Sequence, residues 1–422
     1  MTSSIQRPPR SVLILTSIAP FRTSTLIRSL CFSDILSCGF SLASRLYSLH
    51  DEEPLTTSCT KTKVAAMANP TTRRTRIVCI SDTHNATFKL PKGDVLIHAG
   101  DLTNQGSYSE LSKTVKWLEE ADFEAKIVIA GNHDITLDGK FYSEYGLYFH
   151  SQKPQSPTAC QALLEKSPSI SYLCHETARV RLKSPDGPHT EFTIFGSPYS
   201  PRHGMWAFYY DTPQSSSVMT DLPDLWKDIP LDADVVVTHT PPWTHRDETD
   251  ERRARGCEAL RQALWRVRPR LAVCGHIHVG RGAERVEWDL ESRNVAFAEK
   301  AVTPWSDPGE GNNKLSLVDL TGRKEPTLIN DGSHPDSLTG VKVGNVTFSS
   351  DIEASSGAST SIGKGGDPSS QRSDVEALFG RLGRRETCIV NAAIMKSRYP
   401  HIGGKQFYRP IVVDLDLPVW SE

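Results

Sequence analysis

Short apolar runs, each followed by polar residues, dominate the central part of the chain. Three of them are Arg76–Ile80, Val95–Ala99 and Lys126–Ala130. Each is five residues long, is rich in Val and Ile, and is bounded by Gly or polar residues. This is typical of parallel strands that are covered on both faces. Two later runs, Asp234–Thr238 and Leu271–Cys274, repeat the pattern, which predicts a buried sheet.

The residues that follow these runs are of types that bind metals or substrates. Five motifs stand at these positions: Asp82-Thr83-His84, Gly100-Asp101, Gly131-Asn132-His133-Asp134, His239-Thr240-Pro241-Pro242 and Gly275-His276-Ile277-His278. In open α/β sheets, ligands bind where the carboxyl ends of the strands converge. We therefore expect these side chains to share one crevice.

Two amphipathic helices are predicted between the strands. Ser107 and Glu110 form a capping box, which opens a helix that places Leu111, Val115 and Leu118 on one face. A second helix is predicted over residues 256–268, where Pro269 stops it. Both helices should pack on the sheet through their apolar faces.

Two segments differ in composition from the central part. Residues 1–72 are rich in Arg and Ser and poor in acids, as in a mitochondrial targeting segment, although Met67 offers an alternative start just before the first strand. We expect an extension that is disordered, cleaved or absent from the mature chain. Beyond Pro308 the composition turns to Gly, Ser and Asp, and residues 331–372 have few apolar groups to offset their ordering entropy. We therefore expect residues 309–372 to be a disordered insertion.

The remaining residues, 73–308 and 373–420, are predicted to form a single domain. Two further strands, Thr387–Ile394 and Pro410–Leu415, are predicted near the end of the chain.

Composition limits the compartment and the partners. The chain has 422 residues, a formal net charge of -2 and a mean hydropathy of -0.38, which describes a globular protein with no general attraction to nucleic acid or anionic membranes. No apolar run approaches the roughly 18 residues that a membrane helix needs. The nine cysteines are scattered and odd in number, so a disulfide framework is not expected. We expect a cytoplasmic protein, with the mitochondrion as second choice.

In chain order, the motifs D-x-H, G-D, G-N-H-D, H and G-H-x-H resemble those of the calcineurin-like metallophosphoesterases. Gly196-Ser197-Pro198, Trp206-Ala207-Phe208 and residues 238–242 resemble more narrowly the MPPED-type branch, which is similar to class III cyclic nucleotide phosphodiesterases. The resemblance implies an α/β fold, a four-layer α-β-β-α sandwich of two mixed β-sheets flanked by helices. It also implies that the strands at 387–394 and 410–415 complete the second sheet, so that the end of the chain belongs to the same domain.

The resemblance further implies two divalent metal ions as cofactors. One would be held by Asp82, His84 and His278, the other by Asn132, His239 and His276, with Asp101 bridging the two. Mixed carboxylate, imidazole and amide ligands suit Mn, Fe, Zn or Ni better than Mg or Ca. The identity of the metal is left open.

The expected reaction is hydrolysis of a phosphoric ester. Two cations about 3.5 to 4 Å apart clamp the attacking and leaving oxygens, and a bridging hydroxide attacks phosphorus. We expect His133 to give a proton to the leaving group, because its neighbour Asn132 is a predicted ligand. Asp134 is expected to orient or charge the His133 imidazole.

Three further expectations concern the surroundings of the site. The glycines at 100, 131 and 275 are expected to let the backbone turn sharply, so that the next side chain faces the metals. His98 is predicted to be a buried structural histidine. His245 is left out of the ligand set, because Pro241-Pro242 sends that stretch into an extended loop.

The preferred function is a phosphodiesterase acting on small substrates such as cyclic nucleotides, with a phosphomonoester substrate also open. A nuclease of the same superfamily is an alternative that needs a basic groove and usually a capping domain, and neither is visible. A non-catalytic scaffold is a second alternative, but no predicted ligand position is missing. The insertion at 309–372 remains a candidate for a protein contact.

Overall fold

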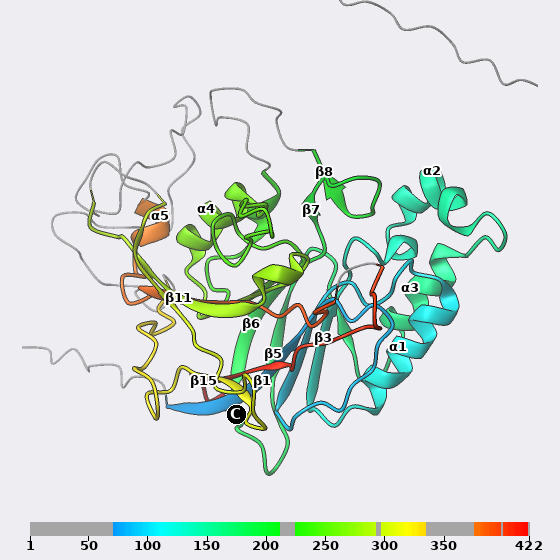
Figure 1. The fold of residues 1–422 in the computed structure, drawn as a ribbon. Coiled ribbons are helices and arrows are strands. Elements are labelled where there is room, and N and C mark those ends of the chain that lie inside the picture. Colours follow the sequence, from blue (N-terminus) through cyan, green and yellow to red (C-terminus); the bar gives the residue numbers. More distant parts are fainter. Residues whose placement is uncertain (1–70, 212–223, 293–296, 335–374, 398–399, 421–422) are drawn as a thin grey trace, which may run out of the picture. The chain divides into compact units, whose positions relative to one another are not determined.

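Two sheets packed face to face form the centre of the computed structural model (Figure 1), which describes residues 71–211, 224–292, 297–334, 375–397 and 400–420. In the described part, the first sheet has the order β13 (Ser316–Asp319), β15 (Ile411–Pro418), β1 (Thr72–Ile80), β2 (Val95–Ala99), β3 (Ala125–Ile129) and β4 (Ser171–Tyr172). The second has the order β12 (Glu299–Pro304), β11 (Gly282–Trp288), β14 (Glu386–Asn391), β10 (Leu271–Cys274), β9 (Val235–Thr238), β6 (Glu191–Ser197) and β5 (Glu176–Arg181). A small separate pair joins β7 (Ser200–Pro201) to β8 (Tyr209–Tyr210).

Helices cover the outer face of each sheet (Figure 1). The α-helices are α1 (Tyr108–Glu120), α2 (Gly139–His150), α3 (Pro157–Glu165), α4 (Glu258–Val267) and α5 (Val375–Leu378), and the 3-10 helices are η1 (Ile135–Leu137), η2 (Asp224–Asp228) and η3 (His278–Gly280). Side chains of α1, α2 and α3 pack on the outer face of the first sheet, and those of α4 and α5 on the second. No helix in these ranges is long and apolar enough to cross a lipid bilayer. The predicted four-layer α/β sandwich of two mixed sheets is confirmed.

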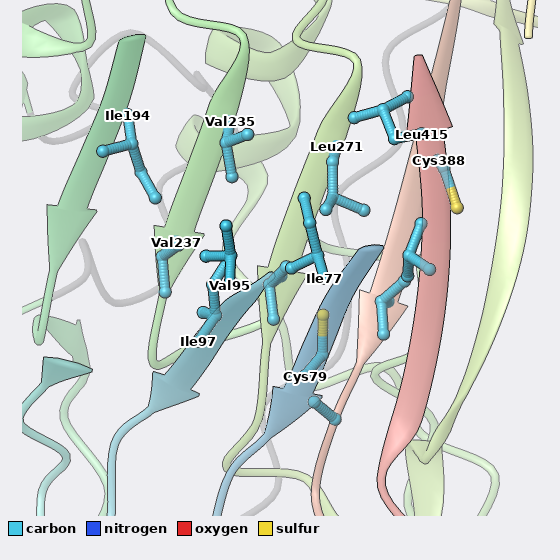
Figure 2. Packing of buried hydrophobic residues seen from close by; sticks show 14 of the residues in the cluster. Ile77, Cys79, Val95, Ile97, Ile194, Val235, Val237, Leu271, Cys388 and Leu415 are labelled. Carbon is cyan, nitrogen blue, oxygen red and sulfur yellow. The ribbon is translucent and has the colours of Figure 1, made fainter. Parts of the chain in front are cut away.

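Alternation along the strands builds three apolar layers. In β1, Ile77 and Cys79 belong to the core between the sheets, whereas Val78 and Ile80 belong to the cluster beneath α1 and α3. Figure 2 shows side chains of both sheets meeting in the central layer, among them Ile77 and Val237. Both faces of the strand are therefore buried, which explains why the sequence runs are continuously apolar.

The strands that precede the candidate ligands run parallel to one another. β1, β2 and β3 are parallel neighbours in the first sheet, and β6, β9, β10 and β14 are parallel neighbours in the second. The two sheets meet at their carboxyl ends, where Ser81 after β1 forms a bridge with Ala393 after β14. The strand ends of both sheets therefore converge on one edge.

The helix predictions agree with the structure. Ser107 caps α1 and forms the predicted capping box with Glu110. Leu111, Val115 and Leu118 are buried, as predicted from their spacing. The second predicted helix corresponds to α4, whose apolar face is buried in the same way.

Two predictions about the end of the chain are wrong. The strand at 410–415 does not complete the second sheet, because β15 lies in the first sheet between β13 and β1, while β14 does lie in the second. The insertion was predicted to start at residue 309, yet β13 lies within it and pairs with β15. Its four residues are too few to stand out from the surrounding Gly and Asn. Residues 335–372 and residues 1–70 of the predicted extension lie outside the described residues.

A buried charged network ties α4 to the edge of the second sheet. The His245 ring contacts Glu284 of β11 at 2.7 Å and Glu299 of β12 at 3.1 Å, and Arg261 of α4 contacts Glu299 at 2.7 Å. Burial works to lower the pKa of His245, but the hydrogen bonds to the two glutamates outweigh it and raise the pKa to about 9. Burial likewise works to raise the pKa of Glu299, but hydrogen bonds from His245 and Arg261 bring it down to about 2.

This network predicts a pH-dependent stability. Because the folded pKa of His245 lies above its ordinary value of 6.5, its contribution is complete below that pH and is lost as the pH rises through about 9. At pH ~6, we expect His245→Gln to lower the free energy of unfolding by about 3 kcal/mol, because the variant leaves buried carboxylates short of a positive partner. The difference from wild type should narrow towards pH ~9.5.

Urea denaturation of both proteins at the two pH values measures this difference. His203→Gln, at an exposed position, is the matched control and should change little. A difference that stays constant between the two pH values would contradict a charged His245 in the folded protein.

Candidate metal centre

The residues that follow the strands adopt an unusual backbone conformation. Asp82, Asp101 and His276 follow β1, β2 and β10 with φ angles of 57°, 53° and 65°, and His84 has a φ of 43°. Residues other than glycine rarely adopt this left-handed conformation, and such strained residues cluster at functional sites. Four of the nine predicted site residues therefore share one form of backbone strain.

The glycines next to these residues act in two different ways. Gly100 has a φ of 96° and supplies a turn, as expected. For Gly131 and Gly275 the expectation of a glycine-specific turn is wrong, because neither has a positive φ. A Cβ at Gly131 would overlap Asp101, and one at Gly275 would overlap Ser81 and Asp82. These two glycines are needed because neighbouring segments lie too close for a side chain.

Asp101 lies at the centre of the predicted ligand set. It is 2% exposed, and ligand atoms of Asp82, Asp101 and His239 lie within 4.8 Å of one another. The same separation holds for His84, Asp101 and His133. A third group within this distance is Asp82, His84 and His278. Asp82, His84 and Asp101 thus each belong to two of the three groups and form the centre of the cluster.

Two histidines point the same ring nitrogen into the site. The Nδ1 atom of His84 lies 3.2 Å from the carbonyl of Thr103, and that of His239 lies 2.8 Å from the carbonyl of Ala99. A carbonyl only accepts, so each Nδ1 carries the proton, and in the neutral ring Nε2 keeps its lone pair. Backbone contacts of this kind orient histidine ligands in metal sites.

The inward Nε2 atoms face other electron-rich atoms. Nε2 of His84 lies 3.4 Å from Nε2 of His278 and 3.7 Å from Asp101. Nε2 of His239 lies 2.9 Å from Oδ1 of Asn132 and 3.4 Å from Asp101. Such atoms can lie this close in a buried space only with a proton or a metal cation between them.

The loop after β10 adds two more imidazoles. Nε2 of His278 lies 3.2 Å from Oδ1 of Asp82. The backbone N–H of His276 donates to both oxygens of Asp82, at 3.1 and 3.0 Å. The His276 ring packs against the His239 ring with centroids 5.0 Å apart, but His276 is in none of the three groups above. The structure thus brings all seven predicted ligands to one place, with His276 at its edge.

The pKa shifts keep the carboxylates ionised and divide the four histidines into two kinds. Burial works to raise the pKa of Asp82, but the charge and hydrogen bond of His278 lower it to about 2. Burial opposes ionisation of Asp101 too, but His239 holds its pKa well below the usual range. Burial lowers the pKa of His84 to about 4 and that of His276 to about 3. Burial works in the same direction on His239 and His278, but Asp101 raises the pKa of His239 to about 9 and Asp82 raises that of His278. The carboxylates thus draw positive charge to the site, which protons supply here and which a pair of divalent cations fits equally well.

His133 is held from three sides at the rim of this cluster. Its Nδ1 lies 2.8 Å from the carbonyl of Asn104, and its backbone N–H donates to Asp101 at 2.8 Å. Its ring contacts that of His84 edge-on with centroids 4.8 Å apart. The other face lies against Trp206, with centroids 3.8 Å apart. With Nδ1 bound to a carbonyl, Nε2 is the nitrogen left to carry a proton to or from a ligand.

The expectation that Asp134 orients the His133 ring is wrong. The fully buried Asp134 carboxylate accepts hydrogen bonds from the backbone N–H groups of Leu102, Thr103 and Gly131 and from the Thr103 hydroxyl. The Asn104 carbonyl takes the orienting role instead. Asp134 ties the loop after β2 to the loop after β3, and so acts on the backbone that carries the ligands.

Two residues that the sequence analysis assigned no role also support the site. The Asn391 side chain at the end of β14 donates to the carbonyls of Ile277 and Arg246, both at 2.9 Å. Lys405 donates to the carbonyl of His84 at 3.0 Å. A signal for Asn391 exists, since it is the one amide within an apolar predicted strand. Lys405 carries no such signal.

His98 behaves as predicted and stays outside the ligand set. It is fully buried, and its Nε2 lies 3.0 Å from the Thr83 hydroxyl. His245 also lies outside the set, since its ring is held by two glutamates of the second sheet.

Comparison with known proteins agrees with this geometry. Residues 75–280 match the model of the family described as calcineurin-like phosphoesterase. The human metallophosphoesterase domain-containing protein 1 is 39% identical over 219 residues, which cover 49% of this chain and 62% of that protein. The UPF0046 protein K07C11.7 of Caenorhabditis elegans is 32% identical, covering 54% of this chain and 69% of that protein.

A third relative differs in name. The probable rhamnogalacturonate lyase C of Emericella nidulans is 41% identical over 232 residues, which cover 54% of this chain but 20% of that protein. The chain thus spans a fifth of this relative and less than two thirds of the human one. The matched domain, the order of the strands and the converging ligands lead to one assignment: this chain belongs to the calcineurin-like phosphoesterase family.

Proposed function

We propose that this chain is a metal-dependent phosphoric ester hydrolase, and that it acts as a phosphodiesterase on small substrates such as cyclic nucleotides. The observation that carries the proposal is the meeting of the two buried carboxylates, Asp82 and Asp101, with inward-pointing Nε2 atoms around one point. The resemblance to MPPED-type proteins and the family match support the choice of a phosphoester as substrate.

The chain offers ligands for two divalent cations. Asp82, His84 and His278 would hold one, Asn132, His239 and His276 the other, and Asp101 would contact both. When bound, such cations neutralise charge on the attacking and leaving oxygens and lower the pKa of a coordinated water. The buried, strained loops fix the ligand atoms before any substrate arrives, which is the contribution of the protein.

His133 is proposed to hold the proton that the leaving group needs. Because Nδ1 is bound to the Asn104 carbonyl, the proton to be transferred sits on Nε2. The ring is only half-buried, unlike the ligands beneath it, so a substrate can reach it. Its contacts with His84 and Trp206 keep the ring plane fixed while the proton moves.

Hydrolysis is expected to depend on the metals and on Asp101. Chelation should abolish hydrolysis of bis-p-nitrophenyl phosphate, and added Mn, Fe, Zn or Ni should restore it. Asp101→Asn should lower kcat by at least ~10²-fold and reduce the metal content, because it removes a buried carboxylate that belongs to two of the three candidate groups. Rates are compared with those for p-nitrophenyl phosphate and for 2',3'- and 3',5'-cyclic nucleotides.

Asp186→Asn is the matched control, because Asp186 is an exposed aspartate. Full activity in chelated enzyme or in Asp101→Asn would contradict the metal-dependent mechanism. Faster turnover of p-nitrophenyl phosphate than of every diester would leave the hydrolase proposal standing and refute the phosphodiesterase preference.

The leaving group of the substrate separates proton donation from other roles of His133. For a poor leaving group, as in a cyclic nucleotide, His133→Ala should lower kcat by roughly 10² to 10⁴-fold while metals stay bound. For bis-p-nitrophenyl phosphate the loss should be much smaller, because p-nitrophenolate is a weak base and leaves without a proton. Equal losses for both substrates would exclude the acid role. His203→Ala tests an exposed histidine for comparison.

Trp206 is expected to act as a positioning residue for His133. Trp206→Ala should lower kcat for cyclic nucleotides by about tenfold or more, because the ring loses the face it lies against. Trp206→Phe should recover most of the rate, since it restores an aromatic face. The effect should vanish for bis-p-nitrophenyl phosphate. A loss confined to KM, or a loss in the Phe variant as large as in Ala, would refute positioning of the proton donor.

A further inference from the structure

A cavity lies outside the cluster of candidate ligands. It has a volume of about 580 Å³, within the range of small-molecule sites. Four cationic side chains line it, those of Arg246, Arg281, Lys396 and Arg409. Two carboxylates, Asp307 and Glu310, line it as well. Positive charge is therefore in excess, in a chain whose net charge is slightly negative.

The cavity borders on two loops of the candidate metal centre. Arg281 follows the ligand His278 by three residues, across the 3-10 helix η3, which places their Cα atoms about 6 Å apart. On another side, the N–H of Tyr408 donates to the carbonyl of Ile394, whose own N–H donates to Ser81, next to Asp82. A ligand in the cavity would thus lie beside the candidate metal centre.

Backbone carbonyls hold the guanidinium groups in place. Arg246 donates to the carbonyls of Gly280 and Arg281, at 3.0 and 2.5 Å. Arg409 donates to the carbonyl of Lys314 at 2.8 Å. Arg281 donates to the carbonyl of Arg409 at 2.9 Å and to Asp307 at 3.1 Å. Carbonyls orient a guanidinium without cancelling its charge, so the positive groups are positioned in advance for an anion.

Few carboxylates compensate these cations. Within the described ranges, Arg281 has an ion pair with Asp307, whereas Arg246, Lys396 and Arg409 have none. Lys396 is exposed and lies over the Tyr408 ring, 5.5 Å from its centroid. The Arg281 guanidinium lies 4.8 Å from the centroid of the same ring. Two cations thus converge on one aromatic ring that lines the cavity.

We propose that this cavity binds a phosphate group that the substrate carries in addition to the phosphoester that is cleaved. The proposal rests on the proposed hydrolase function and narrows its substrate class to small phosphoesters with a second phosphate. Guanidinium and ammonium groups are the usual partners of phosphate in proteins. The second phosphate would bind in the cationic cavity while the scissile ester lies over Asp101 and His133.

A matched pair of substrates tests the proposal. Thymidine 5'-p-nitrophenyl phosphate and thymidine 3'-phosphate 5'-p-nitrophenyl phosphate contain the same scissile diester and differ by one phosphate. We expect the added phosphate to lower KM by about tenfold in the wild-type enzyme. Lys396→Gln, and the double variant with Arg409→Gln, should remove this gain and leave kcat for bis-p-nitrophenyl phosphate unchanged. Lys113→Gln, at an exposed lysine of α1, should keep the gain.

Equal KM values for the two thymidine esters in wild type would overturn the proposal. A gain that persists in the double variant would overturn it as well, since the phosphate would then bind elsewhere.

A binding experiment separates this proposal from the hydrolase proposal. Calorimetry with inorganic pyrophosphate on the chelator-treated full chain needs no turnover, and we expect Lys396→Gln to weaken binding by about tenfold relative to Lys113→Gln. Such binding without hydrolysis of either thymidine ester would support an anion site and refute the proposed function. Hydrolysis of the thymidine esters without any binding of pyrophosphate would support the proposed function and refute the anion site.

Discussion

The structure depends on the burial of two carboxylates that remain ionised. Asp82 and Asp101 are almost fully excluded from solvent, at the ends of neighbouring parallel strands. Burial alone would push their pKa values upward, yet nearby imidazoles hold both pKa values below the ordinary range. Ionised groups in such a place need positive charge close by, and a proton or a metal cation supplies it. The inward Nε2 atoms of His84 and His239 make the site better suited to cations.

The two-sheet architecture holds the strained loops of the site in place. Strands buried on both faces are rigid, and their carboxyl ends bring loops from both sheets to one edge. Strain at Asp82 and Asp101 persists because the surrounding backbone is tightly held. Asp134 contributes by joining two of the loops, and Gly131 and Gly275 allow the close approach of the chain. The same contacts therefore stabilise the fold and fix the geometry of the site.

The sign of the charge changes between the candidate centre and the cavity beside it. The buried cluster holds carboxylates, its rim holds the half-exposed His133, and the adjoining cavity holds an excess of fixed cations. A cluster of anions attracts metals, whereas a cluster of cations attracts phosphates, and the two adjoin through η3. This ordering is the physical basis of the proposed preference for a substrate with more than one anionic group. Trp206 packs against the His133 ring and Tyr408 against the Arg281 guanidinium, so each aromatic ring holds the polar group beside it in place.

Much of the fold and of the ligand set follows from local sequence pattern. Continuous apolar runs such as Ile77–Ile80 have one stable environment, a strand covered on both faces, and polar residues directly after them must lie at the strand ends. The capping box at Ser107 and Glu110 is equally local. Three features depend instead on segments that are far apart in sequence. These are the sheet that β15 joins, the contacts that turn Asp134 away from His133, and the cationic cavity. Only the packed chain decides these, because a hydrogen-bond partner or a charge excess is a property of distances that no single stretch of sequence contains.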